Sequence, residues 1–320
     1  MKKVIITGGA GFIGSHLSEK YIKNGWKVTV IDNLSTGRKE NIKELEKNKN
    51  FYFIYGDITD FDFLKQNIKD FDLIIHLAAA VGVKYIIENP IKSIITNVKG
   101  TENILEIANI DKTPVFIAST SEVYGKNTNI PLKEDDDRVV GSTNVSRWNY
   151  ACSKALDEFL SLAYFREKKL PVVIGRFFNT CGPRQIGEYG MVVPKFIKQA
   201  MLGLPITIYG DGKQSRCFTH VEDVVNAVYA LCEKKECYGN VFNIGSDIQV
   251  TITELATKIV TKLKSDSLIE YIPYNKVYGS NFEDMLVRQP LLDKIRKYIE
   301  FNPEFNIDYI IKDVIKFFES

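Results

Sequence analysis

The feature that most constrains the fold of this 320-residue chain is a glycine-rich segment near its N-terminus. The segment directly follows the β-branched run Val4–Thr7 and reads Thr7-Gly-Gly-Ala-Gly-Phe-Ile-Gly14, after which an amphipathic stretch begins. Glycines at such a junction let the backbone approach a pyrophosphate group, and they let a helix pack closely on a strand. The helix N-terminus adds free N–H groups and the positive end of a dipole. The order of strand, glycine turn and helix therefore predicts a dinucleotide-binding unit.

An acidic residue at the end of the next strand supports this prediction. The run Lys27–Ile31 ends at Asp32, whose carboxylate can accept hydrogen bonds from ribose hydroxyls and repels a 2′-phosphate, which favours NAD over NADP. Arg38 is near enough in sequence to contact a 2′-phosphate, although loop arginines are usually solvated. Asn97 either supports backbone near the cofactor or is a polar residue on a helix face. We expect these residues to border the cofactor: Gly8, Gly11, Phe12, Ile13, Gly14, Asp32, Asn33, Asp57, Ile58, Leu77, Ala78, Ala79, Asn97, Ser119, Tyr150 and Lys154.

Short β-branched runs alternate with amphipathic segments in the first half of the chain. The predicted strands are Val4–Thr7, Lys27–Ile31, Phe51–Tyr55, Leu73–Leu77, Val115–Ala118 and Val172–Arg176. The predicted helices, marked by apolar residues at helical spacing, are Ile13–Asn24, Phe61–Ile68, Ile91–Ala108 and Tyr150–Glu167. This alternation predicts an α/β fold of the Rossmann type, a doubly wound parallel sheet with helices on both faces.

The pattern loosens after Arg176. Turn-rich segments separate predicted helices at Val193–Leu202, Val221–Cys232 and Ile252–Lys262. We therefore expect an NAD-binding domain over residues 1–176 and a smaller, mainly substrate-binding region over residues 177–320. A run near 241–244 is a candidate for a strand that returns to the main sheet.

Composition argues against several classes of protein. The 42 basic and 40 acidic residues give a net charge of +2, so we expect no nucleic-acid or membrane partner. The longest apolar stretch, Leu73–Val83, is well short of the roughly 20 residues that span a bilayer. The five cysteines and three histidines are scattered and form no metal-binding pattern. We expect a cytoplasmic protein without a metal.

Polar residues gather at the carboxyl end of one predicted strand, where catalysis is expected in this kind of sheet. Thr120, Ser121 and Glu122 follow the run Val115–Ala118 almost directly. A side-chain hydroxyl at such a place can hydrogen-bond a reacting hydroxyl group. The strand end therefore supplies candidate catalytic residues.

A tyrosine and a lysine about thirty residues later complete this arrangement. Tyr150 and Lys154 are spaced to share one face of a predicted helix. A nearby ammonium lowers the pKa of a phenol from about 10, so Tyr150 could deprotonate a sugar hydroxyl near neutral pH. Two other Tyr-x-x-x-Lys matches, which begin at Tyr164 and Tyr209, are expected to be the back of the same helix and a turn.

Together, the glycine turn, Asp32, the Ser/Thr strand end and the Tyr150–Lys154 pair resemble the extended short-chain dehydrogenases/reductases, in the branch of nucleotide-sugar epimerases and dehydratases. The similarity covers nearly the whole chain. It implies a Rossmann domain with a smaller C-terminal nucleotide-sugar domain, and NAD as cofactor. It further implies that Tyr150 is the base, that Lys154 holds the ribose and lowers the pKa of Tyr150, and that Thr120 assists. Finally, it implies a homodimer in which the helices Ile91–Ala108 and Tyr150–Glu167 pair with a second subunit, the alternative being ordinary packing on their own sheet.

Within this branch the chain is most similar to UDP-glucuronate decarboxylases. The blocks that carry the similarity begin at Thr120, Arg147, Arg176, Tyr189 and Tyr209. In such an enzyme, oxidation at carbon 4 turns the glucuronate into a β-keto acid, which loses its carboxyl group easily. The resemblance therefore predicts a decarboxylase that acts on a UDP-linked or GDP-linked sugar.

Two candidate residues near the substrate carboxylate follow from this resemblance. They are Glu122 and Arg288, although Glu122 could instead cap local backbone. Ser121 stands where related 4,6-dehydratases have an Asp, which argues against dehydration. The candidate catalytic residues are therefore Thr120, Ser121, Glu122, Tyr150, Lys154 and Arg288.

Residues 79–87 depart from the decarboxylase pattern, which usually has a Ser/Thr-Pro there. This leaves open a 4-epimerase or a 4-dehydrogenase. A non-catalytic NAD-sensing regulator is the alternative of another class, but it would have no use for Tyr150 and Lys154. Arginine forks suit phosphate oxygens, and loops at this sheet edge face ligands. The residues expected to contact the substrate are Val81, Lys84, Asn179, Arg184, Val192, Lys195, Tyr209, Arg216 and Arg288.

Overall fold

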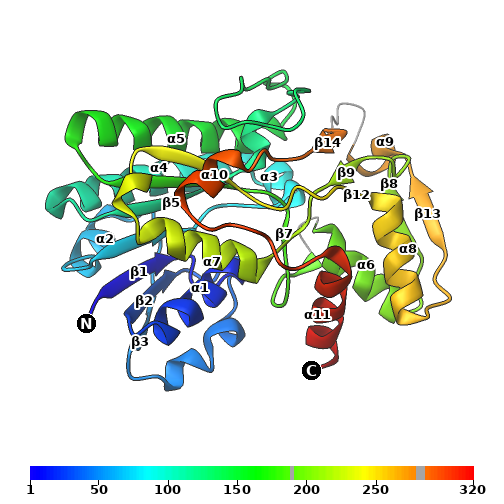
Figure 1. Ribbon diagram of the computed structural model, residues 1–320, viewed down its shortest axis with the longest axis horizontal. Helices are drawn as coiled ribbons and strands as arrows, with labels where there is room; N and C mark the ends of the chain where they lie inside the picture. Colours follow the sequence, from blue (N-terminus) through cyan, green and yellow to red (C-terminus); the bar gives the residue numbers. More distant parts are fainter. Residues whose placement is uncertain (188–190, 279–284) are drawn as a thin grey trace.

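A seven-stranded parallel sheet forms the centre of the computed structural model, which describes residues 1–187, 191–278 and 285–320 (Figure 1). In spatial order the strands are β11 (Asn240–Ile244), β6 (Val172–Phe177), β5 (Val115–Thr120), β4 (Leu73–His76), β1 (Lys3–Thr7), β2 (Lys27–Asp32) and β3 (Phe51–Tyr55). Successive strands are added on one side as far as β3, and the chain then crosses back to β4 beside β1. In open sheets of this kind, ligands bind at the carboxyl ends of the strands where the order reverses.

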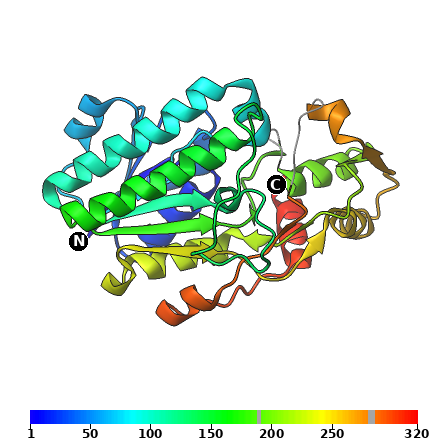
Figure 2. The ribbon, with the colours of Figure 1, turned by 90° about the horizontal axis from the view of Figure 1, so that it is seen from above.

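Helices cover both faces of this sheet (Figure 2). On one face, α1 (Phe12–Lys23) and α7 (Val221–Cys232) share a hydrophobic core with the strands, and α10 (Asp293–Tyr298) joins it. On the other face, α2 (Phe61–Asn67), α4 (Pro90–Asp111) and α5 (Trp148–Lys168) form a second core. Because the central strands are covered twice, every residue of β4 is buried. This is why the sequence has a continuous apolar run there.

A smaller part of the chain packs beside the carboxyl ends of the sheet (Figure 1). The helices α6 (Val192–Met201), α8 (Ile252–Leu263) and α11 (Ile307–Glu319) share a core of their own. The strand β8 (Ile206–Tyr209) pairs in parallel with β13 (Ile269–Ile272). A further small sheet has the order β12 (Val250–Thr251), β9 (Ser215–Arg216), β14 (Val287–Arg288), and β7 (Thr180–Cys181) pairs with β10 (Thr219–His220).

The predicted Rossmann fold is confirmed, and the predicted strands and helices lie within three residues of the observed bounds. The sequence analysis did not identify α3 (Val83–Glu88), α9 (Tyr274–Tyr278), α10, α11 or the two-residue strands. Most of these elements are too short to have a periodicity of their own, because tertiary packing stabilises them. The exception is α11, whose buried residues Ile310, Ile311, Val314 and Ile315 have clear helical spacing.

The two parts of the chain are interleaved. The candidate returning strand corresponds to β11, which pairs in parallel with β6 at the edge of the main sheet. The helix α7 also belongs to the core of that sheet, although it follows residue 176. The division of the chain at residue 176 into an NAD-binding part and a mainly substrate-binding part therefore stays a prediction. In the described ranges, no helix combines the length and apolar character that a membrane crossing needs.

Candidate active site

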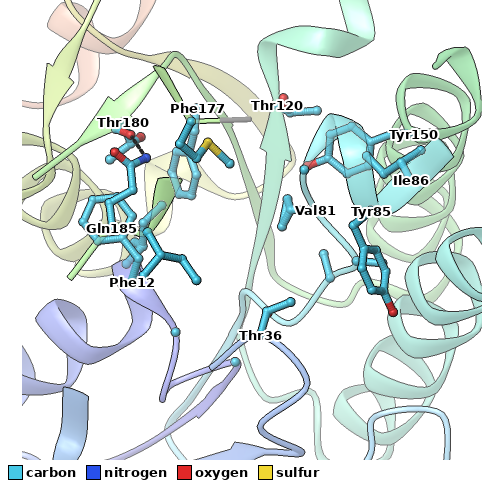
Figure 3. Close-up of a pocket in the computed structure, with 18 of the residues that line it drawn as sticks. Phe12, Thr36, Val81, Tyr85, Ile86, Thr120, Tyr150, Phe177, Thr180 and Gln185 are labelled. Atoms are coloured by element: carbon cyan, nitrogen blue, oxygen red, sulfur yellow. Dashed lines mark hydrogen bonds between the residues drawn. The ribbon is translucent and has the colours of Figure 1, made fainter. Parts of the chain in front are cut away.

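A large cavity of about 1080 Å³ lies between the carboxyl ends of the main sheet and the smaller part of the chain. Residues of the glycine turn, of the ends of β2, β4 and β5, of the start of α5 and of the loops after β6 line it. Figure 3 shows Tyr150, Val81 and Tyr85 on one side, opposite Phe177 and Gln185. The cavity thus brings together segments that are far apart in the sequence.

The glycine turn has a compact backbone that leaves the start of α1 open. The N–H of Gly11 donates to the carbonyl oxygen of Gly8, whose φ of 72° lies in the left-handed region. A Cβ atom on Gly14 would collide with that same carbonyl oxygen. The N-cap of α1 is Gly11, and no side chain of the described residues caps this N-terminus. Gly8, Gly11, Phe12, Ile13 and Gly14 all line the cavity, so the open N–H groups of α1 are available to an anion there.

The carboxylate of Asp32 lies at the edge of the cavity beside this turn. Its Oδ2 accepts from the N–H of Ala10 at 3.0 Å, and its Oδ1 accepts from the N–H of Leu34 at 2.8 Å. Burial raises the pKa of Asp32, and these two backbone hydrogen bonds oppose the rise. Each carboxylate oxygen has lone pairs left for a further donor, such as a ribose hydroxyl. Arg38 also lines the cavity, at an exposed position of the loop after β2.

Asn33 lines the cavity, whereas Asp57 lies behind it and does not. The Nδ2 of Asn33 donates to Oδ2 of Asp57 at 2.9 Å. Burial acts to raise the pKa of Asp57, but hydrogen bonds from Thr59 and Asn33 outweigh it, and the pKa is lowered. Asp57 therefore orients Asn33, and its contact with the cofactor stays a prediction. The neighbouring Ile58 does line the cavity.

Small residues after β4 form another wall. Leu77, Ala78 and Ala79 all line the cavity. Asn97 does not, because it is buried in α4 and bonds the backbone behind this wall. Its Oδ1 accepts from the N–H of Ala80 at 2.7 Å. Two roles were considered for Asn97. The structure agrees with the first, in which its side chain supports the backbone near the cavity.

Thr120 and Tyr150 meet at one end of the cavity and both line it (Figure 3). The pKa of Tyr150 is raised, first by burial and then by the negative charge of Glu122, while a hydrogen bond with Thr120 opposes the rise. The expectation that Lys154 lowers this pKa is thus corrected for the protein alone. The physical reasons are the burial of the phenol and the negative charge of Glu122. The Lys154 ammonium, for its part, is paired with another carboxylate.

That carboxylate belongs to Asp157, one turn further along α5. The Nζ of Lys154 lies 2.7 Å from Oδ2 of Asp157, and both side chains are almost fully buried. Lys154 is not among the described residues that line the cavity. Ser119 does line it, and its hydroxyl donates to Oε1 of Glu158, which also pairs with Arg176.

A cluster of two guanidinium groups and one carboxylate lies beside Tyr150. The Nη1 of Arg288 is 2.7 Å from Oε1 of Glu122, and the Nη2 of Arg147 is 3.4 Å from Oε2 of the same residue. The Nη1 of Arg288 also lies 3.5 Å from the hydroxyl of Ser121. All four side chains belong to residues that line the cavity, and the two arginines are buried. Counted over these described residues, two positive charges and one negative charge give the cluster a formal excess of one positive charge.

The remaining substrate candidates also line the cavity, with one exception. Val81, Asn179, Arg184, Val192, Lys195, Tyr209 and Arg216 are all part of its wall. The side chain of Lys84 lies outside the described part of the structure, as does Tyr189.

Three of the substrate candidates have protein partners that fix their place. Arg184 donates to Ser15 and pairs with Glu19 on α1, so it lies nearer to the glycine turn than expected. The ammonium of Lys195 lies 3.9 Å from the ring centre of Tyr209.

Arg147 and Tyr85 are cavity residues that the sequence analysis did not include among its candidates. Arg147 stands directly before α5 in a block that was already recognised, so its spacing to Tyr150 was a usable signal. Tyr85 lies on α3, a short helix that no periodicity predicted. Only the tertiary structure places it opposite the end of β6.

Comparisons with known proteins agree with this geometry. The family described as GDP-mannose 4,6 dehydratase matches residues 5–314. A UDP-N-acetyl-alpha-D-glucosaminuronate decarboxylase of Bacillus cytotoxicus is 43% identical over 320 residues, which cover 100% of this chain and 98% of the relative. UDP-glucuronic acid decarboxylase 1 of Arabidopsis thaliana is 36% identical over 307 residues, 95% of this chain and 67% of the relative.

Solved structures give the same result. The UDP-glucuronic acid 4-epimerase of Bacillus cereus, in complex with UDP-glucuronic acid and NAD, has a TM-score of 0.89 and 28% identity, with 99% of each chain covered. The UDP-glucose 4-epimerase of Thermotoga maritima, with UDP-glucose, has a TM-score of 0.89 and 29% identity over 99% of this chain and 98% of that one. The chain therefore belongs to the GDP-mannose 4,6-dehydratase family of enzymes, within the extended short-chain dehydrogenases/reductases that act on nucleotide sugars.

Proposed function

We propose that this enzyme uses NAD to oxidise carbon 4 of a UDP-linked hexuronic acid and then releases the carboxyl group as CO₂. The observation that carries the proposal is the cluster of Arg147, Glu122 and Arg288 beside Tyr150. Its excess positive charge suits the carboxylate of a uronic acid. The Nε–H of Arg288 is buried and has no acceptor among the described residues, so it can serve a substrate carboxylate.

The residues around the glycine turn fit NAD. The close approach at Gly8 and Gly14 and the open N-terminus of α1 suit a pyrophosphate, and Asp32 suits the adenosine ribose. Arg184 is the nearest candidate for a further pyrophosphate contact, given its place beside α1. When bound, NAD supplies a hydride acceptor for the sugar carbon. Lys154 has three N–H donors, so it can offer one to the ribose while another stays on Asp157.

The chain's own groups supply the proton chemistry. Tyr150 takes the proton of the 4-hydroxyl, and Thr120, which hydrogen-bonds Tyr150, holds that hydroxyl in place. The resulting 4-keto acid loses CO₂ because the electrons of the carbon–carboxyl bond pass into the ketone as an enolate. Carbon 5 then takes up a proton, so each CO₂ released consumes one proton from solution. Returning the hydride to carbon 4 completes a redox-neutral cycle.

The 43% identical relative bears the name of an N-acetylated substrate, which makes UDP-N-acetylglucosaminuronate the first compound to test. The stretch that departs from the glucuronate decarboxylase pattern supports this choice. Val81 and Gly82 line the cavity there, and small side chains leave room for a 2-acetamido group. UDP-glucuronate is the second compound, and a GDP-linked uronate is the third.

Ser121 argues against a dehydratase. Its side chain is buried and lies beside Arg288, where an alcohol is a poor acid for the loss of water. A 4-epimerase is the second candidate, because an epimerase of UDP-glucuronic acid has nearly the same fold. Both candidates bind a carboxylate, so product analysis must separate them.

The decisive experiment incubates the protein and NAD with each uronate and follows product mass and NADH absorbance. A mass loss of one CO₂ supports the decarboxylase. Unchanged mass with a changed sugar configuration supports the epimerase, and lasting NADH with a loss of two hydrogens supports a dehydrogenase.

Tyr150→Phe is the matched variant for the question of catalysis. It removes the proton acceptor but keeps the ring, so we expect turnover to fall at least about a hundredfold, the contribution typical of a general base, while NAD binding persists. A wild type without turnover on any uronate, or a variant with unchanged turnover, supports an NAD-sensing regulator instead.

We also propose a homodimer that forms through α4 and α5. Both helices lie on the outer side of the sheet (Figure 2). They expose large apolar side chains, with Ile91 73%, Ile95 53%, Leu156 49% and Phe159 59% accessible. Exposed apolar side chains on two helices that pack together are what an interface with a second subunit would cover. All five cysteines are free thiols, which fits the reducing cytoplasm as the proposed compartment.

A further inference from the structure

The ion pair between Lys154 and Asp157 is a feature that the proposed function does not explain. Lys154 Nζ and Asp157 Oδ2 are 2.7 Å apart, and the two side chains are 3% and 1% exposed. Burying two charges costs free energy that their attraction only partly returns, so such a pair is weak evidence for stability. Stability alone therefore gives little reason for burying a lysine and a carboxylate together at this place.

The side chains around the pair are mostly uncharged or already paired with other charged groups. From β4, His76 faces Lys154, and burial followed by the charge of Lys154 lowers the pKa of His76 to about 3, so His76 is uncharged at neutral pH. From α4, Thr101 is the near side chain. Glu158, the next residue of α5, is held by Arg176 and Arg138. Among the described residues, Asp157 is thus the carboxylate that balances the buried ammonium.

We propose that Asp157 is a positioning residue for the oxidation: it holds Lys154 on the face of α5 that carries Tyr150 and, by its charge, sets the pH range in which Tyr150 acts as a base. This inference rests on the proposed function. Asp157 does not line the cavity, so it acts through Lys154 and Tyr150.

The electrostatic sign follows from the charges that face Tyr150. Asp157 on α5 and Glu122 after β5 both raise the pKa of Tyr150, because a phenolate near a carboxylate is unfavourable. Arg288 and Arg147 already neutralise Glu122, and Lys154 already neutralises Asp157. Removing the charge of Asp157 removes a repulsion and leaves the Lys154 ammonium unbalanced. Both changes favour the phenolate.

The test is Asp157→Asn in the full-length protein with NAD, because the amide keeps the shape and can still accept a hydrogen bond from Lys154. We expect the acid limb of the pH profile of kcat/KM to move to lower pH by roughly one unit. The affinity for NAD, measured by titration calorimetry, should stay within about threefold, since Asp157 does not line the cavity.

Two controls separate charge from structure. Asp157→Glu keeps the charge, so its acid limb should stay where the wild type has it. Glu167→Gln removes a carboxylate from the exposed end of the same helix and should also leave the profile unmoved. If Asp157→Asn does not fold, Asp157→Ser is the second variant, with the same shift of the acid limb and a weaker affinity for NAD.

The outcomes are distinct. An acid limb that stays in place in both Asp157→Asn and Asp157→Ser overturns the inference, as does an equal loss of rate at every pH. A wild type that turns over no uronate contradicts the proposed function instead. A shift in Glu167→Gln of the same size would show that any carboxylate on α5 has this effect, and it too would overturn the specific role of Asp157.

Discussion

At the scale of single residues, the feature that bears on the reaction is the group of charged side chains beside Tyr150. Glu122 is bound by two buried guanidinium groups, from Arg147 at the start of α5 and Arg288 on β14. Among the described residues the cluster carries one more positive than negative charge, and a buried charge is stabilised by an ionic partner. The carboxylate of a uronic acid is such a partner, and a neutral hexose is not.

Replacing Arg288 by Met should therefore separate decarboxylation from cofactor binding. We expect kcat/KM for CO₂ release to fall roughly 10- to 100-fold, since a hydrogen bond to a charged group contributes about 1.5–3 kcal/mol. NAD content should not change. Arg296→Met is the matched control, because Arg296 forms an exposed pair with Asp247 and neither residue lines the cavity. Equal rates in Arg288→Met and in the wild type would contradict a contact with the carboxylate.

A second residue-scale prediction concerns His76 and stability in acid. Its pKa is lowered to about 3 in the folded protein by burial and by Lys154, against 6.5 ordinarily. Between these two pH values the unfolded chain binds more protons, so the free energy of unfolding rises with pH and is lost as pH falls from 6.5 toward 3. His76→Gln should reduce this slope by up to about 1.4 kcal/mol per pH unit. Urea unfolding at several pH values measures the slope, and identical slopes would refute the prediction.

At the scale of elements, the turn between β1 and α1 has almost no free space. A Cβ atom on Gly14 would meet the backbone of Gly8 and Gly9, which cannot move aside as a flexible side chain could. At Gly25, by contrast, no atom lies within 4 Å of an added Cβ atom, and only the left-handed φ of 79° opposes a side chain.

Gly14→Ala should therefore abolish NAD binding and destabilise the fold, because α1 has to move away from β1. Gly25→Ala is its control and should cost only about 1–2 kcal/mol of unfolding free energy, the usual penalty for an L-residue in this region, with NAD binding intact. Fluorescence titration with NADH and thermal melting measure both quantities. Tight NADH binding by Gly14→Ala would mean that the cofactor does not depend on this turn.

The helix α5 has two different faces. Its inner face carries Tyr150, Lys154 and Asp157 toward the site, and its outer face exposes Leu156 and Phe159. The period of the helix separates the two sets, because residues three or four apart share a face. A change in the outer face therefore reaches the site only through movement of the whole helix.

At the scale of the whole molecule, the proposed dimer predicts a change of mass on substitution. Phe159→Glu places a charge in the centre of the exposed apolar surface and should convert a dimer to a monomer, because an unpaired charge cannot be buried cheaply. Sedimentation velocity measures the mass. Leu268→Glu, at a position that is 72% exposed in the smaller part of the chain, is the control and should leave the mass unchanged. A monomeric wild type would contradict the proposal outright.

The fold was predictable because its signals are local and periodic. The run Leu73–His76 is apolar throughout since both of its faces are buried, and the amphipathic helices have one face on the sheet. The glycine turn and Asp32 were also found from sequence, because their spacing along one βαβ unit fixes their place in space. Short elements such as α3 were missed, since they are stable only against the rest of the molecule.

The site was predictable in its members but not in its contacts. Tyr150, Thr120 and Glu122 follow strand and helix ends, and such ends meet at one edge of a parallel sheet. The expected lowering of the Tyr150 pKa is not found in the protein alone, because the phenol is buried and Glu122 is near it, while Asp157 binds the Lys154 ammonium. Asp57 and Asn97 likewise support neighbours of the cavity without lining it.

By itself, then, the sequence determined the sheet, the nucleotide turn and the family, because each depends on neighbours within one βαβ unit or one helix. Only the tertiary structure decided which charges meet. Electrostatic energy depends on distance and burial, and the partners Glu122 and Arg288 are separated by most of the second half of the chain. Their approach, like the pairing of Lys154 with Asp157, depends on how the finished helices and loops pack.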